Sequence, residues 1–125
     1  MALFHEELSK EVIAAAIEVH RALGPGLLES VYEECLGYEL LQRGMHCQRQ
    51  APLPVRYKYD QLECGYRIDL IVNNVLIVEL KSIDSLQGIH EAQLMTYLRL
   101  SGKKVGLLIN FNVMLLKDGI VRRVI

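Results

Sequence analysis

Apolar residues recur at steps of three and four near the start of the chain, which is the pattern of an amphipathic helix. The pattern predicts a helix over residues 6–23. Gly24-Pro25-Gly26 would end it, because proline cannot continue a helix and glycine permits a tight reversal. A second helix is predicted over residues 28–43, before Gly44. Its inward face is expected to hold Val31, Cys35, Tyr38 or Leu36, and Leu40.

The period then changes to the alternation that is typical of β-strands. Residues 46–50 and 53–59 are predicted to form one strand, broken near Pro52 and Pro54, with a turn at Asp60-Gln61. A hairpin over residues 63–81 follows. The remaining predicted elements are a helix over residues 88–100, with apolar Ile89, Ala92, Leu94, Met95 and Leu98, and strands over residues 104–110, 113–116 and 120–124, the last two joined by a turn at Lys117-Asp118-Gly119.

This order of elements is helix, helix, three strands, helix, three strands. It predicts an α/β or α+β fold in which helices flank a central mixed β-sheet. The length of 125 residues suits a single domain over residues 1–125.

Composition narrows the class of protein. The chain is 51% hydrophobic and 23% charged, as expected of a globular protein. It has no apolar run of the roughly 20 residues that span a bilayer, and its start lacks the features of a signal peptide, so we expect a cytoplasmic protein with no membrane partner. The three cysteines are Cys35, Cys47 and Cys64. Their odd number and wide spacing favour reduced thiols over disulfides or a zinc site.

The formal net charge of −1 excludes a global attraction to nucleic acid. If the partner is a polyanion, positive charge must be gathered locally. The candidates are Arg43, Arg49, Arg56, Lys58, Lys103, Lys104, Arg122 and Arg123.

The stretch from residue 66 to 81 breaks the rule that buried strands are apolar. Two apolar runs are split by Asn73 and Asn74, which indicates a hairpin. Asp69, Glu79 and Lys81 lie within these runs. Buried charges are unfavourable unless they are paired or bind a metal, so these three residues are the first candidates for chemistry.

Whether the two carboxylates meet depends on the hairpin loop. A two-residue loop would pair Val72 with Val75 and turn Asp69 away from Glu79. A three-residue loop pairs Val72 with Leu76 instead and sets Asp69 across from Glu79. Asparagine tolerates the left-handed backbone that such a loop needs, so we predict the three-residue register.

Two adjacent carboxylates repel each other and favour a hard divalent cation such as Mg²⁺ or Mn²⁺. Such an ion polarises a phosphodiester oxygen and activates water. Lys81 leaves the same strand face as Glu79, where it could orient that water or stabilise developing negative charge. The alternative, which the spacing alone leaves open, is an Asp/Glu/Lys ion-pair network without chemistry.

The arrangement of Asp69, then Glu79-Leu80-Lys81 on the next strand, resembles the PD-(D/E)XK nuclease superfamily. The segment Gly26-Leu27-Leu28-Glu29-Ser30-Val31-Tyr32 is similar to the motif of the GxxExxY proteins, small members of that superfamily. The resemblance covers nearly the whole chain. One departure is Ile68, which stands where the superfamily name has proline.

The resemblance implies a restriction-endonuclease-like core and a nuclease that acts on DNA or RNA with Mg²⁺ or Mn²⁺. It assigns Asp69 and Glu79 as metal ligands, Glu29 as a further ligand or one acting through water, and Lys81 as the catalytic lysine. Tyr32, Gln93 and Tyr97 would support the site.

Alternatives remain open for these residues and for the whole chain. Glu29 would otherwise serve helix electrostatics, Tyr32 core packing, and Gln93 with Tyr97 a solvent-facing stripe. For the chain, the alternatives are a nucleic-acid-binding or partner-binding module with little turnover and a purely structural or regulatory subunit. Because cutting two strands needs two sites, a homodimer is a further hypothesis.

Overall fold

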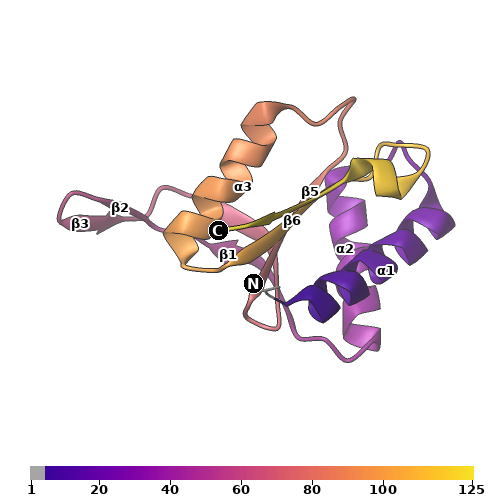
Figure 1. The fold of residues 1–125 in the computed structure, drawn as a ribbon, viewed down its shortest axis with the longest axis horizontal. Helices are drawn as coiled ribbons and strands as arrows, with labels where there is room; N and C mark the ends of the chain where they lie inside the picture. The colour runs from indigo at the N-terminus through magenta and orange to yellow at the C-terminus, as the bar shows by residue number, and fades with distance from the viewer. Residues whose placement is uncertain (1–4) are drawn as a thin grey trace.

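The computed structural model describes residues 5–125, and a mixed five-stranded sheet lies at its centre (Figure 1). The strands in spatial order are β1 (Cys47–Pro52), β4 (Arg67–Val72), β5 (Leu76–Lys81), β6 (Val105–Asn110) and β7 (Ile120–Val124). All neighbours are antiparallel except β5 and β6. A parallel pair needs a long crossover, and helix α3 (Gly88–Ser101) supplies it.

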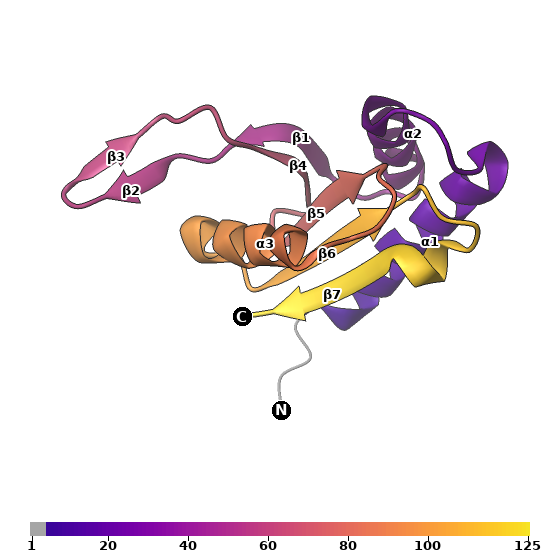
Figure 2. The ribbon, with the colours of Figure 1, turned by 90° about the horizontal axis from the view of Figure 1, so that it is seen from above.

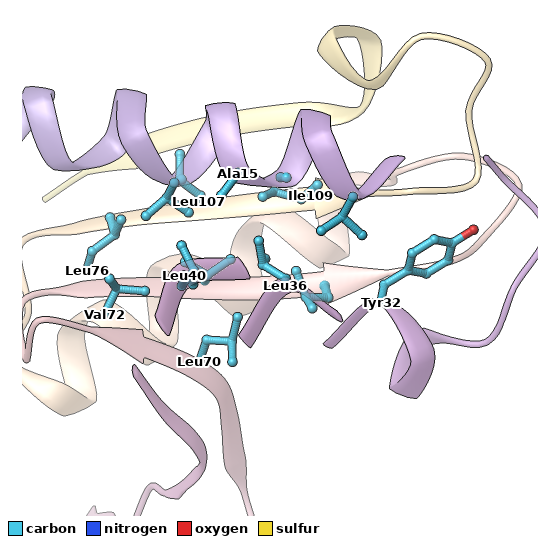
Figure 3. Close-up of a cluster of buried hydrophobic side chains, with 14 of the residues drawn as sticks. Ala15, Tyr32, Leu36, Leu40, Leu70, Val72, Leu76, Leu107 and Ile109 are labelled. Carbon is cyan, nitrogen blue, oxygen red and sulfur yellow. The ribbon is translucent and has the colours of Figure 1, made fainter. Parts of the chain in front are cut away.

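The three α-helices divide between the two faces of the sheet (Figure 2). Helices α1 (Glu6–Leu23) and α2 (Glu29–Gln42) pack on one face, and α3 packs on the other. In Figure 3 the side chains of Leu36 and Leu40 of α2 lie over a strand of the sheet, and Leu107 and Ala15 of the same cluster lie beside them. Removing these apolar side chains from water stabilises the layer by roughly 25 cal/mol per Å².

Alternation along β5 decides which residues reach each layer. Leu76, Val78 and Leu80 belong to the core beneath α1 and α2. The intervening side chains of Ile77, Glu79 and Lys81 therefore leave the face that α3 covers.

The predicted fold class is confirmed, and so are the bounds of the first helix, which spans Glu6–Leu23. The three cysteines are free, as predicted. In the part of the chain that the structure describes, no helix is both long enough and apolar enough to cross a membrane.

The predicted inward face of the second helix is partly wrong. Val31 and Tyr38 are exposed, whereas Tyr32, Leu36 and Leu40 are fully buried. Both sets of residues are apolar and follow helical spacing, so the sequence pattern alone did not decide which set packs. In the fold, the Tyr32 ring stacks on Phe111, with centroids 4.4 Å apart, and this contact fixes the rotation of α2. In α3, Ile89 is likewise exposed.

The strand predicted over residues 113–116 is wrong. Asn112 to Leu115 form bends and η1 (Leu116–Gly119) is a 3-10 helix, which also replaces the predicted turn over residues 117–119. The segment packs back on α1, where His20 Nε2 lies 2.8 Å from the Val113 carbonyl oxygen. Strand β6 already has neighbours on both sides, so this sheet offers no place beside it for another strand.

A small hairpin, which we call the arm, projects from the body (Figures 1 and 2). It consists of β2 (Val55–Tyr57) and β3 (Asp60–Leu62), which form a separate two-stranded sheet. The predicted turn at Asp60-Gln61 is therefore wrong: the chain turns at Lys58-Tyr59, where Lys58 has a φ of 57°. Lysine at a left-handed position has no marked sequence signature, which is why the turn was misplaced.

Tyr32 anchors the loop between α1 and α2. Its hydroxyl donates to the Gly24 carbonyl at 2.6 Å and accepts from the Leu27 amide at 3.2 Å. In Figure 3 this hydroxyl lies at the end of the ring that points away from the packed leucines. Gly24 has a φ of 71° and a ψ of −175°, a conformation that is essentially limited to glycine. Tyr32 therefore fixes the approach of the chain to the first turn of α2.

We expect Tyr32→Phe to lower the free energy of unfolding by about 1–2 kcal/mol, because it removes both hydroxyl hydrogen bonds but keeps the ring. Urea denaturation measures this change. The control is Tyr38→Phe, whose ring is exposed on the same helix and which should change stability by less than about 0.5 kcal/mol. Equal effects of the two variants would contradict an anchoring role for the Tyr32 hydroxyl.

Candidate active site

The hairpin between β4 and β5 has the register that brings Asp69 to Glu79. Val72 pairs with Leu76 and Leu70 with Val78, so the loop has three residues, as predicted. Asn73 and Asn74 take left-handed conformations, with φ of 50° and 61°. Continuing the register by one residue places Asp69 across from Glu79.

At this point side chains replace the regular backbone ladder. The Asp69 amide donates to Glu79 Oε2 at 2.8 Å, and the Leu80 amide donates to Asp69 Oδ2 at 2.8 Å. Each carboxylate thus accepts an N–H group from the neighbouring strand. These two bonds hold the carboxylates side by side.

Burial and nearby negative charges raise the pKa values of both carboxyl groups. Glu79 is 5% exposed, and its burial, followed by the charge of Asp69, raises its pKa to about 8. Burial also raises the pKa of Asp69, although the bond from Leu80 and the charge of Lys81 oppose the shift. Without a cation, the pair therefore tends to hold a proton at neutral pH.

Lys81 and two of the predicted supporting residues, Gln93 and Tyr97, line one cleft. A cavity of about 730 Å³ lies between α3 and the base of the arm, and Lys81, Gln93, Tyr97 and Tyr66 are among the residues that line it. Tyr97 is 5% exposed, so it is no solvent-facing residue. Burial raises the pKa of its hydroxyl, and nearby Glu79 adds to the shift. The Tyr97 hydroxyl is thus kept as a protonated donor close to the carboxylates.

Glu29 affects the two carboxylates through its charge and does not contact them. It is exposed at the start of α2, and its charge raises the pKa values of Asp69 and Glu79. The loop before it is tied to the end of β5, because Ser82 Oγ donates to the Leu27 carbonyl. Tyr32, one turn further along α2, lies in the core instead of facing this cluster.

The three predicted metal ligands do not form a ready-made chelate. Among residues 5–125, no group of three or more His, Cys, Asp or Glu side chains is arranged to hold a metal ion. Asp69 and Glu79 come together, while Glu29 stays apart from them.

Two further polar residues were missed by the sequence analysis. Glu33 is buried at 8% exposure, and Gln50 Nε2 donates to Glu33 Oε1 at 2.6 Å and to Asp69 Oδ1 at 3.4 Å. Arg49 completes the group with an ion pair to Glu33 at 3.1 Å. Gln50 has a φ of 52°, an unfavourable backbone conformation for this residue type. The only sequence signal is that Glu33 lies four residues after Glu29 and thus on the same helix face.

The donor set fits a hard cation that keeps most of its water. Mg²⁺ usually binds through one or two carboxylates, with waters and substrate phosphate in its other positions. Glu79 Oε1 accepts no hydrogen bond from the described residues. No side-chain nitrogen or oxygen among them is both buried and without a partner, so this oxygen must be accessible. Asp69 and Glu79 would offer such an ion two carboxylates.

Comparison with known proteins supports the predicted fold class. A family model described as the PD-(D/E)XK nuclease superfamily matches residues 6–124, nearly the whole chain. Together with the mixed five-stranded sheet and its three α-helices, the match identifies a restriction-endonuclease-like fold. No curated protein and no solved structure matches the chain.

Because the pKa of Glu79 is raised in the folded state, this residue should destabilise the metal-free protein as pH rises from about 4.5 to about 8. In that window the unfolded side chain is ionised while the folded one keeps its proton. Glu79→Gln stays neutral, so we expect it to exceed the wild type in stability at pH 8 by on the order of a few kcal/mol and to match it near pH 4.

Urea denaturation in EDTA across this pH range measures the difference. Glu7→Gln is the control, because the Glu7 side chain is 91% exposed and its removal should change little at any pH. A Glu79→Gln curve parallel to that of the wild type would contradict the raised pKa.

Proposed function

The chain belongs to the PD-(D/E)XK nuclease superfamily, and on this premise we propose that it is a divalent-metal-dependent nuclease that hydrolyses phosphodiester bonds of DNA or RNA. One observation carries the proposal: the exchanged hydrogen bonds that hold Asp69 beside Glu79, with Lys81 two residues further along β5. PD-(D/E)XK nucleases generally use divalent metal ions.

Mg²⁺ or Mn²⁺ would be held by Asp69 and Glu79, with Glu29 acting through water. When bound, such an ion supplies an activated water and neutralises charge on the phosphate. The negative charge of the acidic side chains attracts a cation, and their carboxylate oxygens favour a hard divalent one.

Lys81 contributes a positive charge that is free to bind substrate. Within the described part of the chain it forms no salt bridge, and it lines the cleft. In our proposal its ammonium group binds a phosphate oxygen and stabilises the negative charge that develops in the transition state. Gln93 and Tyr97 present an amide and a protonated hydroxyl from α3, which orient the phosphate or the attacking water.

We also propose that the chain belongs to the GxxExxY group. Each of the three motif residues has a structural role in this chain. Gly26 has a φ of 94°, which favours glycine. Glu29 begins α2 near the carboxylates, and Tyr32 anchors the loop that places it.

The test is cleavage of single-stranded, duplex and branched substrates with Mg²⁺ or Mn²⁺. Lys81→Ala and Asp69→Ala should each lower kcat by about 100-fold or more, the usual loss when a group that stabilises the transition state is removed. Lys104→Ala is the control, because Lys104 is exposed outside the cleft. No cleavage by the wild type, or cleavage that both variants retain, would refute the enzymatic proposal.

A second function is favoured by one observation, the lack of a three-ligand metal group in residues 5–125. It is a nucleic-acid-binding or partner-binding module with little turnover. Calorimetric titration with Mg²⁺ or Mn²⁺ separates the two proposals. Metal binding that Glu79→Gln abolishes supports the nuclease, whereas salt-sensitive nucleic-acid binding without metal binding supports the module.

We further propose that the protein acts as a homodimer in the cytoplasm. Cutting both strands of a duplex needs two sites, which a two-fold axis supplies. The three free cysteines suit a reducing compartment. Sedimentation that gives only monomer at micromolar concentration would contradict the dimer.

A further inference from the structure

The arm and the loop between it and β4 expose three tyrosine rings. Tyr57 is 60% exposed, Tyr59 95% and Tyr66 47%. These are three of the six tyrosines of the chain. Aromatic side chains are usually buried, because their burial stabilises the fold. Several exposed aromatic side chains in one segment therefore indicate a binding surface.

The same segment carries positive charge. Arg56, Lys58 and Arg67 are exposed, against Asp60 and Glu63, so residues 55–67 have a net charge of +1 in a chain of −1. Lys58 Nζ lies 5.4 Å from the centroid of the Tyr57 ring. Among the described residues, none of these three cations is in a salt bridge. Their charge is therefore available to a ligand.

The arm continues the wall of the cleft that contains Lys81. Val55 and Tyr66 line this cleft, and the rings of Tyr66 and Tyr97 meet edge to face with centroids 6.0 Å apart. Tyr57 is two residues after Val55 in β2 and so leaves the same face of the arm. Figure 2 shows the arm extending beyond β1 and β4, away from α1 and α2. Rings thus run from the cleft to the tip of the arm.

We propose that the arm binds an unpaired segment of a nucleic-acid strand and leads it to the cleft at Lys81. This inference rests on the proposed function and narrows its substrate to nucleic acid with a single-stranded region next to the cut. Bases stack on exposed aromatic rings and cations hold the phosphates, which is the usual chemistry of single-strand binding. In a duplex the faces of the bases are already stacked, so the rings of the arm would find no partner there.

The experiment measures the fluorescence anisotropy of a labelled oligothymidylate of about 20 nucleotides, alone or annealed to its complement. The full chain is used, in EDTA to prevent metal-dependent cleavage. We expect the single strand to bind more tightly than the duplex. Tyr57→Ala with Tyr59→Ala should weaken this binding about tenfold or more, because stacking contributes about 1–3 kcal/mol per base.

Two controls isolate stacking from other effects. Tyr57→Phe with Tyr59→Phe keeps both rings and should retain the wild-type affinity. Tyr38→Ala removes an exposed ring on α2, far along the chain from the arm, and should have no effect. Circular dichroism checks that each variant is folded.

Several results would overturn the inference. These are no binding of the single strand, equal affinity for the duplex, or an alanine pair that binds like the wild type. An alanine pair that changes only self-association, seen by sedimentation, would also overturn it and make the arm a contact between copies.

The inference and the proposed function fail in different ways. Arm-dependent binding without metal-dependent cleavage refutes the nuclease and keeps the arm. Cleavage of single-stranded substrate with an unchanged KM in the alanine pair refutes the arm and keeps the nuclease.

Discussion

The exchange of hydrogen bonds between Asp69 and Glu79 is the constraint on which the rest of the structure depends. Two carboxylates in a sheet interior are unfavourable, and each is tolerated because it accepts a backbone N–H group from the neighbouring strand. The exchange requires the three-residue loop at Asn73, because a shift of one residue would turn Asp69 to the other face. In this part of the hairpin, side-chain hydrogen bonds thus replace the backbone ladder and form a paired acidic site.

Such a site lowers the stability of the folded protein. The raised pKa of Glu79 reflects surroundings that disfavour its charged form. A cation that binds only the folded state would remove this penalty and stabilise the protein by mass action. The core around Leu36, Leu40 and the strands beneath them offsets the cost, and Glu79 lies on β5, a strand of which every residue but Lys81 is buried.

The sequence alone predicted the structure correctly where a local pattern was compatible with a single conformation. Helix α1 and the register across Asn73 were predicted correctly, because periodicity and turn chemistry act over a few residues. It was insufficient where tertiary contacts chose between equal options. The face of α2 depended on Tyr32 stacking against Phe111, and residues 113–116 packed on α1 rather than pairing. The Glu33–Gln50 contact joins segments far apart in the chain and requires a left-handed glutamine, for which no local pattern exists.

The acidic candidate site bears on the role that we propose for the arm in a protein of nearly neutral charge. In the proposed nuclease, a phosphate group would approach Asp69 and Glu79, and the charges of these residues and of nearby Glu29 would repel a polyanion. A cation at the carboxylates would relieve this repulsion only locally, and Lys81 adds one compensating charge. The remaining affinity must then come from outside the acidic cluster. Aromatic stacking suits this purpose, because it does not depend on charge and is weakened little by nearby carboxylates. In our proposal, the exposed tyrosines of the arm therefore supply affinity that the acidic site does not.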